Sequence, residues 1–183
     1  MESKEAICAA LRQLVLVQPF ESISIQGVCD KAGLSRKTFS RNFADLQDVV
    51  RYQVYLDFTK PMGDFNRIMG VVDYESVLSF ERNLAVLKAN ADYYLAVCRR
   101  FGSAWFAEQL AQSSLAIDFA PYARHRFGDT ELSFVEHYCA FAVANAFRWW
   151  IDEGFATPRE EVARLIDRWL YARFREMKAE GGR

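Results

Sequence analysis

Several residue types and patterns that mark common classes of protein are scarce in this chain of 183 residues. Only 4 prolines and 9 glycines are present, which excludes a collagen-like or linker-like chain. The 23 Lys and Arg residues nearly equal the 24 Asp and Glu residues, which excludes a polybasic nucleic-acid coat and an acidic tail. What remains is a folded soluble protein.

Targeting and membrane segments are also missing from the sequence pattern. The N-terminal stretch MESKEAICAALRQ has charges within its first turn and no long apolar segment, unlike a signal peptide. No apolar run approaches the roughly 20 residues of a membrane-spanning helix. We therefore expect a cytoplasmic protein with reduced thiols and no membrane partner.

The 4 cysteines and 2 histidines lack the spacing of a metal or catalytic site. No Cys-x-x-Cys pair occurs, and the histidines lie too far apart for a His-Glu-x-x-His site. A Gly-rich phosphate loop and a Gly-x-Ser-x-Gly turn are missing as well. The sequence therefore predicts no metal, no cofactor and no enzyme, with cysteines that serve as small core residues.

Apolar residues are abundant and repeat at helical spacing. Hydrophobic residues make up 51% of the chain and aromatic residues 15%, which is enough for a substantial core. Almost every segment follows the helical period, and none alternates like a convincing strand. We predict an all-α fold, an N-terminal helix-turn-helix module of three helices followed by a C-terminal helical bundle.

Residues 24–43 carry the most specific local pattern. Ser24 can cap one short helix, Gly33 can end it in the left-handed conformation, and Ser35 can cap the next. Two short helices joined by a glycine-containing turn are typical of a helix-turn-helix. The second of them bears cations and hydrogen-bonding side chains on its outer side, with no acidic residue between Ser35 and Ala44.

The stretch 29–50, CDKAGLSRKTFSRNFADLQDVV, resembles the second to fourth helices of the TetR/AcrR family of transcriptional regulators. The likeness lies in helix length, in the position of Gly33 and in the pair Phe39 and Phe43. It covers residues 1–50, whereas the rest of the chain agrees only in size and helical character. The resemblance implies a double-stranded DNA operator as partner, contacted by Ser24, Gln26, Ser35, Arg36, Lys37, Thr38, Ser40, Arg41 and Asn42.

These residues would share the work of DNA binding. Arg36 and Lys37 occupy the first helical turn, from which helix-turn-helix proteins usually reach base edges. Either could pair with guanine, and Thr38 could contact a thymine methyl group or a phosphate. Arg41 and Asn42 would reach the DNA backbone. We interpret Arg12 and Lys31 instead as charges on a solvated helix face.

Some features depart from the family pattern and support an alternative. Relatives usually have a tyrosine at Ser40 and a lysine at Leu46, and both commonly contact phosphates. Six cations balance six carboxylates in residues 1–50, so the module as a whole is neutral. The alternative is a TetR-like helical dimer with weakened DNA binding that acts as a small-molecule or protein-binding module.

Two long helical segments near the C-terminus carry more apolar surface than one buried stripe needs. They run from about Thr130 to Glu153 and onward from a start signal at Thr157, where Pro158 and Glu160 complete the capping pattern. In relatives this pair forms a homodimer. The residues we assign to such an interface are Ala142, Ala146, Trp149, Trp150, Leu165 and Trp169.

The middle helices would hold any effector pocket. Its expected lining is Tyr94, Cys98, Phe101, Trp105, Phe106 and Phe119, which suits an apolar or aromatic small molecule, although aromatic residues at helical spacing are more often core. We place the DNA-binding domain at residues 1–46 and the ligand-sensing and dimerisation domain at 47–183. The expected function is that of a homodimeric repressor released from a palindromic operator by its effector.

Overall fold

The computed structural model of the chain describes residues 2–61, 63–64, 77–116 and 128–171. All regular elements within these ranges are helical, which confirms the expected all-α fold. The longer helices are α1 (Ser3–Val15), α2 (Ile25–Ala32), α3 (Arg36–Asn42), α4 (Leu46–Val54), α6 (Val77–Ala89), α7 (Ala91–Phe101), α8 (Ser103–Leu115), α10 (Asp129–Asp152) and α11 (Arg159–Ile166). Shorter turns are η1 (Phe20–Ser22), η2 (Tyr55–Thr59) and η3 (Asp167–Tyr171).

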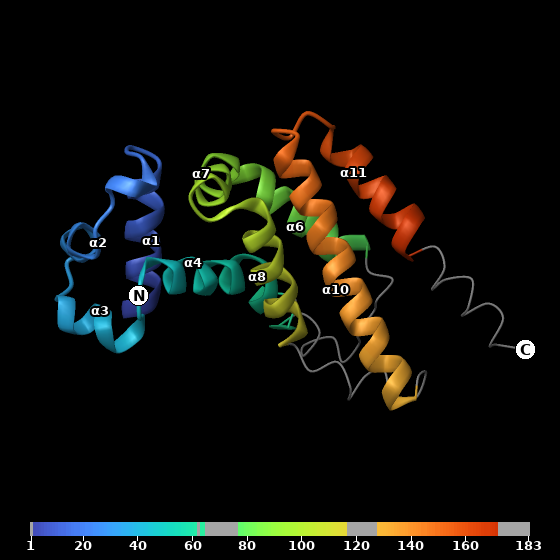
Figure 1. The fold of residues 1–183 in the computed structure, drawn as a ribbon, viewed down its shortest axis with the longest axis horizontal. Helices are drawn as coiled ribbons and strands as arrows, with labels where there is room; N and C mark the ends of the chain where they lie inside the picture. Colours follow the sequence, from blue (N-terminus) through green and yellow to red (C-terminus); the bar gives the residue numbers. More distant parts are fainter. Residues whose placement is uncertain (1, 62, 65–76, 117–127, 172–183) are drawn as a thin grey trace, which may run out of the picture.

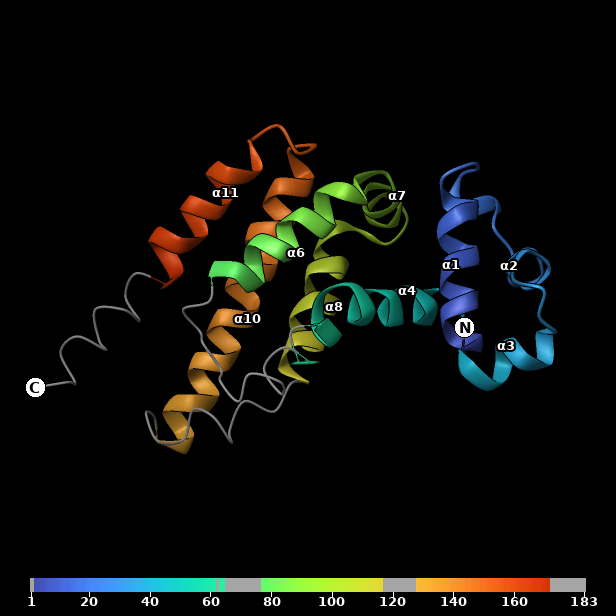
Figure 2. The ribbon, with the colours of Figure 1, turned by 180° about the vertical axis from the view of Figure 1, so that it is seen from behind.

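The helices form a small N-terminal module and a larger bundle arranged along one long axis. Helices α2 and α3 lie beyond α1 at one end of this axis, and α10 and α11 lie at the other (Figures 1 and 2). Helix α4 leads from the module into the bundle, where it contacts α8. The outer side of the module is therefore far from the last two helices.

Local signals in the sequence explain the module. The Ser24 hydroxyl accepts a hydrogen bond from the Gly27 amide at 3.0 Å, and the Ser35 hydroxyl accepts one from the Thr38 amide at 3.1 Å. Gly33 lies between the two helices with φ 67° and ψ 30°, the left-handed conformation expected for it. Apolar side chains on the inner faces of α1, α2 and α3 are almost completely buried, including Ile7, Leu11, Val28, Cys29 and Phe39.

Helix α4 is capped by Asp45, whose carboxylate accepts a hydrogen bond from the Asp48 amide at 2.7 Å. Val50, Val54 and Phe58 are buried along one side of α4 and η2. The backbone passes without a break into the π-helical turn η2. Because π-turns disturb the regular hydrogen-bond ladder, they frequently occur at functional positions.

The bundle core is built on packed aromatic rings. Phe58 lies at the centre, with ring centroids 5.4 Å from Tyr94, 6.4 Å from Phe106 and 6.3 Å from Phe147. These residues come from η2, α7, α8 and α10, so one cluster joins four elements. No helix within the described ranges is long and apolar enough to cross a membrane.

The expectations for Arg12 and for Thr157 are wrong. Arg12 is not a solvated surface charge, since it is half-buried and forms an ion pair with Asp57 across the joint between module and bundle. Thr157 does not cap α11. Its hydroxyl donates to a Glu153 carboxylate oxygen at 2.7 Å instead, and Pro158 occupies the position before the helix.

Candidate nucleic-acid interface

Helix α3 is anchored by its inner face and open on its outer face. Phe39 and Phe43 are 1% and 4% exposed, with ring centroids 6.0 Å apart. Phe43 also packs against Tyr52 of α4, with ring centroids 5.7 Å apart, which fixes α3 against the connecting helix. The short helix therefore has a defined orientation even though only one side of it contacts the protein.

The outer face of α3 presents a cluster of free cations. Arg36, Lys37 and Arg41 are all exposed, as is Ser40. Among the residues that the structure describes, none of the three cations has a carboxylate oxygen within 4.0 Å. Their charge is thus available to an external anion.

Thr38 and Asn42 form the half-buried margin of this face. The Asn42 amide donates to the Thr38 carbonyl at 2.7 Å, and the Thr38 hydroxyl lies 2.9 Å from the Ser35 hydroxyl. These contacts hold the two side chains against their own helix. Ser24 and Ser35 are exposed but engaged as caps, so their first role is to position α2 and α3.

Three of the six carboxylates in residues 1–50 are engaged in contacts with groups outside α3, so the neutral total does not describe the charge on α3 itself. Asp30 accepts a hydrogen bond from the side chain of Gln26 at 2.7 Å on α2. Asp45 caps α4, and Asp48 accepts from the Ala44 amide at 3.1 Å and lies 3.9 Å from Arg51. Net charge therefore underestimates the local positive potential at α3.

An apolar groove lies on the opposite end of the molecule, between α10 and α11. Its volume is about 400 Å³, and its lining includes five of the six residues assigned to the dimer interface. Trp149 is 43% exposed and Trp169 is 74% exposed, which is unusual for such large apolar side chains. The lining residues are Tyr138, Ala142, Ala146, Trp149, Val162, Leu165, Ile166, Trp169 and Leu170.

Trp150 is the exception and corrects the sequence-based assignment. Its side chain is fully buried, its indole N–H donates to the Thr157 carbonyl at 2.7 Å, and its ring packs on Phe155 at 4.9 Å. It is therefore part of the protomer's own core and cannot be presented to a partner.

The sequence reasoning missed Phe134, which continues the exposed stripe along α10. Phe134 is 68% exposed and stacks on Tyr138, which is 52% exposed, with ring centroids 6.1 Å apart. The spacing of 134, 138, 142 and 146 places these residues on one side of a helix, a signal that was present in the sequence.

The residues assigned to an effector pocket pack in different parts of the bundle. Tyr94 and Phe106 are fully buried and pack together at 5.2 Å within the core. Phe101 packs against Phe20 at 5.2 Å and Trp105 at 4.8 Å, near the module, and Cys98 is half-buried. Phe119 lies outside the described residues. The pocket stays a prediction.

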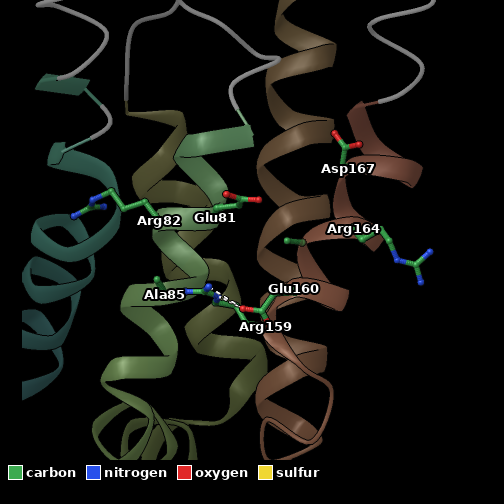
Figure 3. Close-up of a pocket in the computed structure, with 8 residues that line it drawn as sticks. Glu81, Arg82, Ala85, Arg159, Glu160, Arg164 and Asp167 are labelled. Carbon is green, nitrogen blue, oxygen red and sulfur yellow. Dashed lines mark hydrogen bonds and ion pairs between the residues drawn. The ribbon is translucent and has the colours of Figure 1, made fainter.

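A second hollow, of about 540 Å³, lies between α6 and α11 (Figure 3). Arg159 and Glu160 pair with each other there at 2.8 Å, while Arg164 points away from them. The lining combines three acidic with three basic side chains, so it shows no preference for a ligand of either charge. Its residues are Glu81, Arg82, Ala85, Arg159, Glu160, Ala163, Arg164 and Asp167.

Comparison with known proteins gives a match at the level of the fold. No protein-family model matches the chain, and no curated protein matches its sequence. Among solved structures, the chain is similar to the dihydroxyacetone kinase operon activator DhaS, with a TM-score of 0.59 and 20% sequence identity. The likeness covers 93% of this chain and 95% of that chain. The likeness therefore shows a shared fold over nearly the whole length of both chains.

Proposed function

We propose that this protein is a DNA-binding transcriptional regulator of the TetR/AcrR type and that α3 is its recognition helix. The observation that carries the proposal is the exposed cluster of Arg36, Lys37 and Arg41 on a helix anchored from behind by Phe39 and Phe43. A helix of this kind fits the major groove of B-DNA, where its side chains read base edges. The fold likeness to an operon activator agrees with a regulator and gives no support to an enzyme.

Within this proposal the residues of α2 and α3 divide into readers and supports. Arg36 and Lys37 read bases from the first turn of α3, and Arg41 and Ser40 contact the DNA backbone. Ser24, Ser35, Thr38 and Asn42 hold the helices in position through their observed hydrogen bonds. Gln26, exposed at the start of α2, contacts a phosphate after exchange of its hydrogen bond to Asp30.

The protein acts as a homodimer in this proposal, with the α10–α11 groove as the shared surface. Two copies related by a two-fold axis bury the same residues on each side, Trp149 and Trp169 foremost. Their recognition helices then enter successive major grooves of a palindromic operator, one helical turn of DNA apart. We place the domain boundary between residues 46 and 47, at the start of α4.

We also propose that the protein acts as a repressor and that a small apolar or aromatic effector controls it. Both follow from the family resemblance of residues 1–50, because regulators of this type hold DNA in one conformation and release it when a ligand favours another. The aromatic character of the middle helices supports an apolar effector.

The test is a selection of preferred duplexes from random DNA, followed by fluorescence anisotropy with the selected site. Arg36→Ala and Lys37→Ala each remove one base contact, so we expect about 10-fold weaker binding and relaxed preference at one base position. Lys31→Ala is the matched control because Lys31 is an exposed lysine of the same module that lies off α3. It should leave the dissociation constant unchanged.

Two results would contradict the proposal. The first is a selection that returns no preferred sequence. The second is selective binding that the α3 variants leave intact. Either result would favour the alternative, a helical dimer that binds a protein or small molecule. Ser40 and Leu46 already favour that alternative, because they replace the tyrosine and lysine with which relatives usually contact phosphates.

A further inference from the structure

A polar cluster is buried where the module meets the bundle. The guanidinium group of Arg12, on α1, forms an ion pair with the Asp57 carboxylate on η2 and donates to the Asn90 side-chain oxygen at 2.8 Å. It also lies over the ring of Tyr93, 5.0 Å from the centroid. The side chains of Arg12 and Asp57 are 25% and 14% exposed, so solvent screens this pair only partly.

Asp57 connects most of the elements at this joint. Besides Arg12, its carboxylate accepts hydrogen bonds from the Tyr94 hydroxyl of α7 and from the Gln53 side chain of α4, the latter at 2.8 Å. Its main-chain carbonyl accepts from Arg82 of α6 at 3.0 Å. One residue on a π-helical turn therefore links α1 of the module to α6 and α7 of the bundle, besides its local contact with α4.

The polar groups of the joint are not all satisfied in this arrangement. The Arg12 Nε atom and the Tyr93 hydroxyl are buried and lack a hydrogen-bond partner among the described residues. A buried donor without a partner disfavours the conformation that contains it. The observed orientation of α1 on the bundle therefore leaves two buried polar atoms unpaired at the contact that holds it.

We propose that the Arg12–Asp57 pair is a latch that sets the orientation of the helix-turn-helix module on the bundle. With the pair closed, α1 and the attached α2 and α3 occupy one orientation. With the pair open, the module samples a second orientation in which the two recognition helices of a dimer are no longer matched to one turn of DNA. The effect on DNA rests on the proposed function, whereas the effect on module orientation does not.

The orientation is measured by double electron–electron resonance between nitroxides on Lys31→Cys in α2 and Glu108→Cys in α8. The background carries Cys98→Ala, since the other native thiols are buried, and labelled chains are diluted with excess unlabelled chain. Asp57→Asn removes the negative charge of the Arg12–Asp57 pair and leaves the positive one. Arg12→Met with Asp57→Asn removes both charges and leaves no unpaired one buried, which keeps a folded variant in the series.

The control is Asp152→Asn, the same substitution in the exposed Arg148–Asp152 pair of α10, whose atoms lie 3.5 Å apart. We expect one narrow distance distribution in the unsubstituted protein and in the control. Both latch variants should broaden it or add a second population. On selected DNA they should bind about threefold or more weakly, because the competent fraction of molecules falls.

An unchanged distance distribution in the folded double variant would overturn the latch, whatever the protein does with DNA. If the distances change but the unsubstituted protein selects no DNA, the proposed function fails and the latch stands as a property of the joint. The two proposals therefore fail separately.

Discussion

At the scale of single residues, Gly33 and Gly27 are six positions apart in the sequence and have different backbone conformations. Gly33 has φ +67°, a conformation that side chains disfavour, whereas Gly27 lies inside α2. A Cβ added at Gly27 would lie 3.5 Å from the Ser24 hydroxyl oxygen, an ordinary contact. Gly33→Ala should destabilise the protein by about 1 kcal/mol, and Gly27→Ala should stabilise it by about 0.5–1 kcal/mol. Urea denaturation measures both, and equal effects of the two changes would contradict this description.

The thiols make a second residue-scale prediction. Burial raises the pKa of Cys8, Cys98 and Cys139 to about 12, and it raises that of Cys29 as well. Since the thiolate is the reactive form, the native protein at pH 8 should react with a thiol reagent far more slowly than the urea-unfolded protein. Rapid labelling of all four thiols without unfolding would show that the cysteines are not core residues.

Arginine residues show where sequence reasoning stops. The neighbours of Arg36 predict an exposed position, and it is exposed, because the Ser35 cap and the burial of Phe39 fix the short helix locally. Arg12 was assigned in the same way and the assignment is wrong. Its partners Asp57 and Asn90 lie 45 and 78 positions away, and no local pattern reveals contacts over such separations.

At the scale of elements, the short helices of the module were predictable from local chemistry, and the faces of the long helices were predictable only in part. Trp149 and Trp150 are adjacent in α10, and adjacent residues of an α-helix point roughly 100° apart. One ring can therefore be exposed while the other is buried, as observed. The sequence marked both as apolar and could not tell which side the rest of the chain covers.

The exposed groove of α10 and α11 gives a prediction about assembly. Trp169→Glu places a charge in the centre of the proposed interface, and because Trp169 is 74% exposed the protomer itself should stay folded. We expect a dimer to become a monomer in sedimentation velocity. Val17→Glu is the control, because Val17 is 77% exposed outside α10 and α11, in the N-terminal module. Dimers that persist in Trp169→Glu would place the interface elsewhere.

At the scale of the whole molecule, the candidate DNA-binding face and the apolar groove lie at opposite ends of the long axis (Figure 1). Helix α4, η2 and the Arg12–Asp57 pair lie between them. In the proposed dimer, this arrangement would hold the two α3 helices apart without burying them. A conformational change in the bundle can then reach α3 through α4, η2 and the Arg12–Asp57 pair.

The central claim is that α3 binds DNA through its free cations, and a salt series tests it most directly. The dissociation constant for the selected duplex should rise steeply with salt, by a slope of about 0.9 on logarithmic axes for each phosphate neutralised. Arg41→Ala, which removes one proposed backbone contact, should weaken binding to all sequences and lower that slope by about one. A dissociation constant that is independent of salt, or a slope that Arg41→Ala leaves unchanged, would contradict the assignment of α3 as the DNA-binding helix.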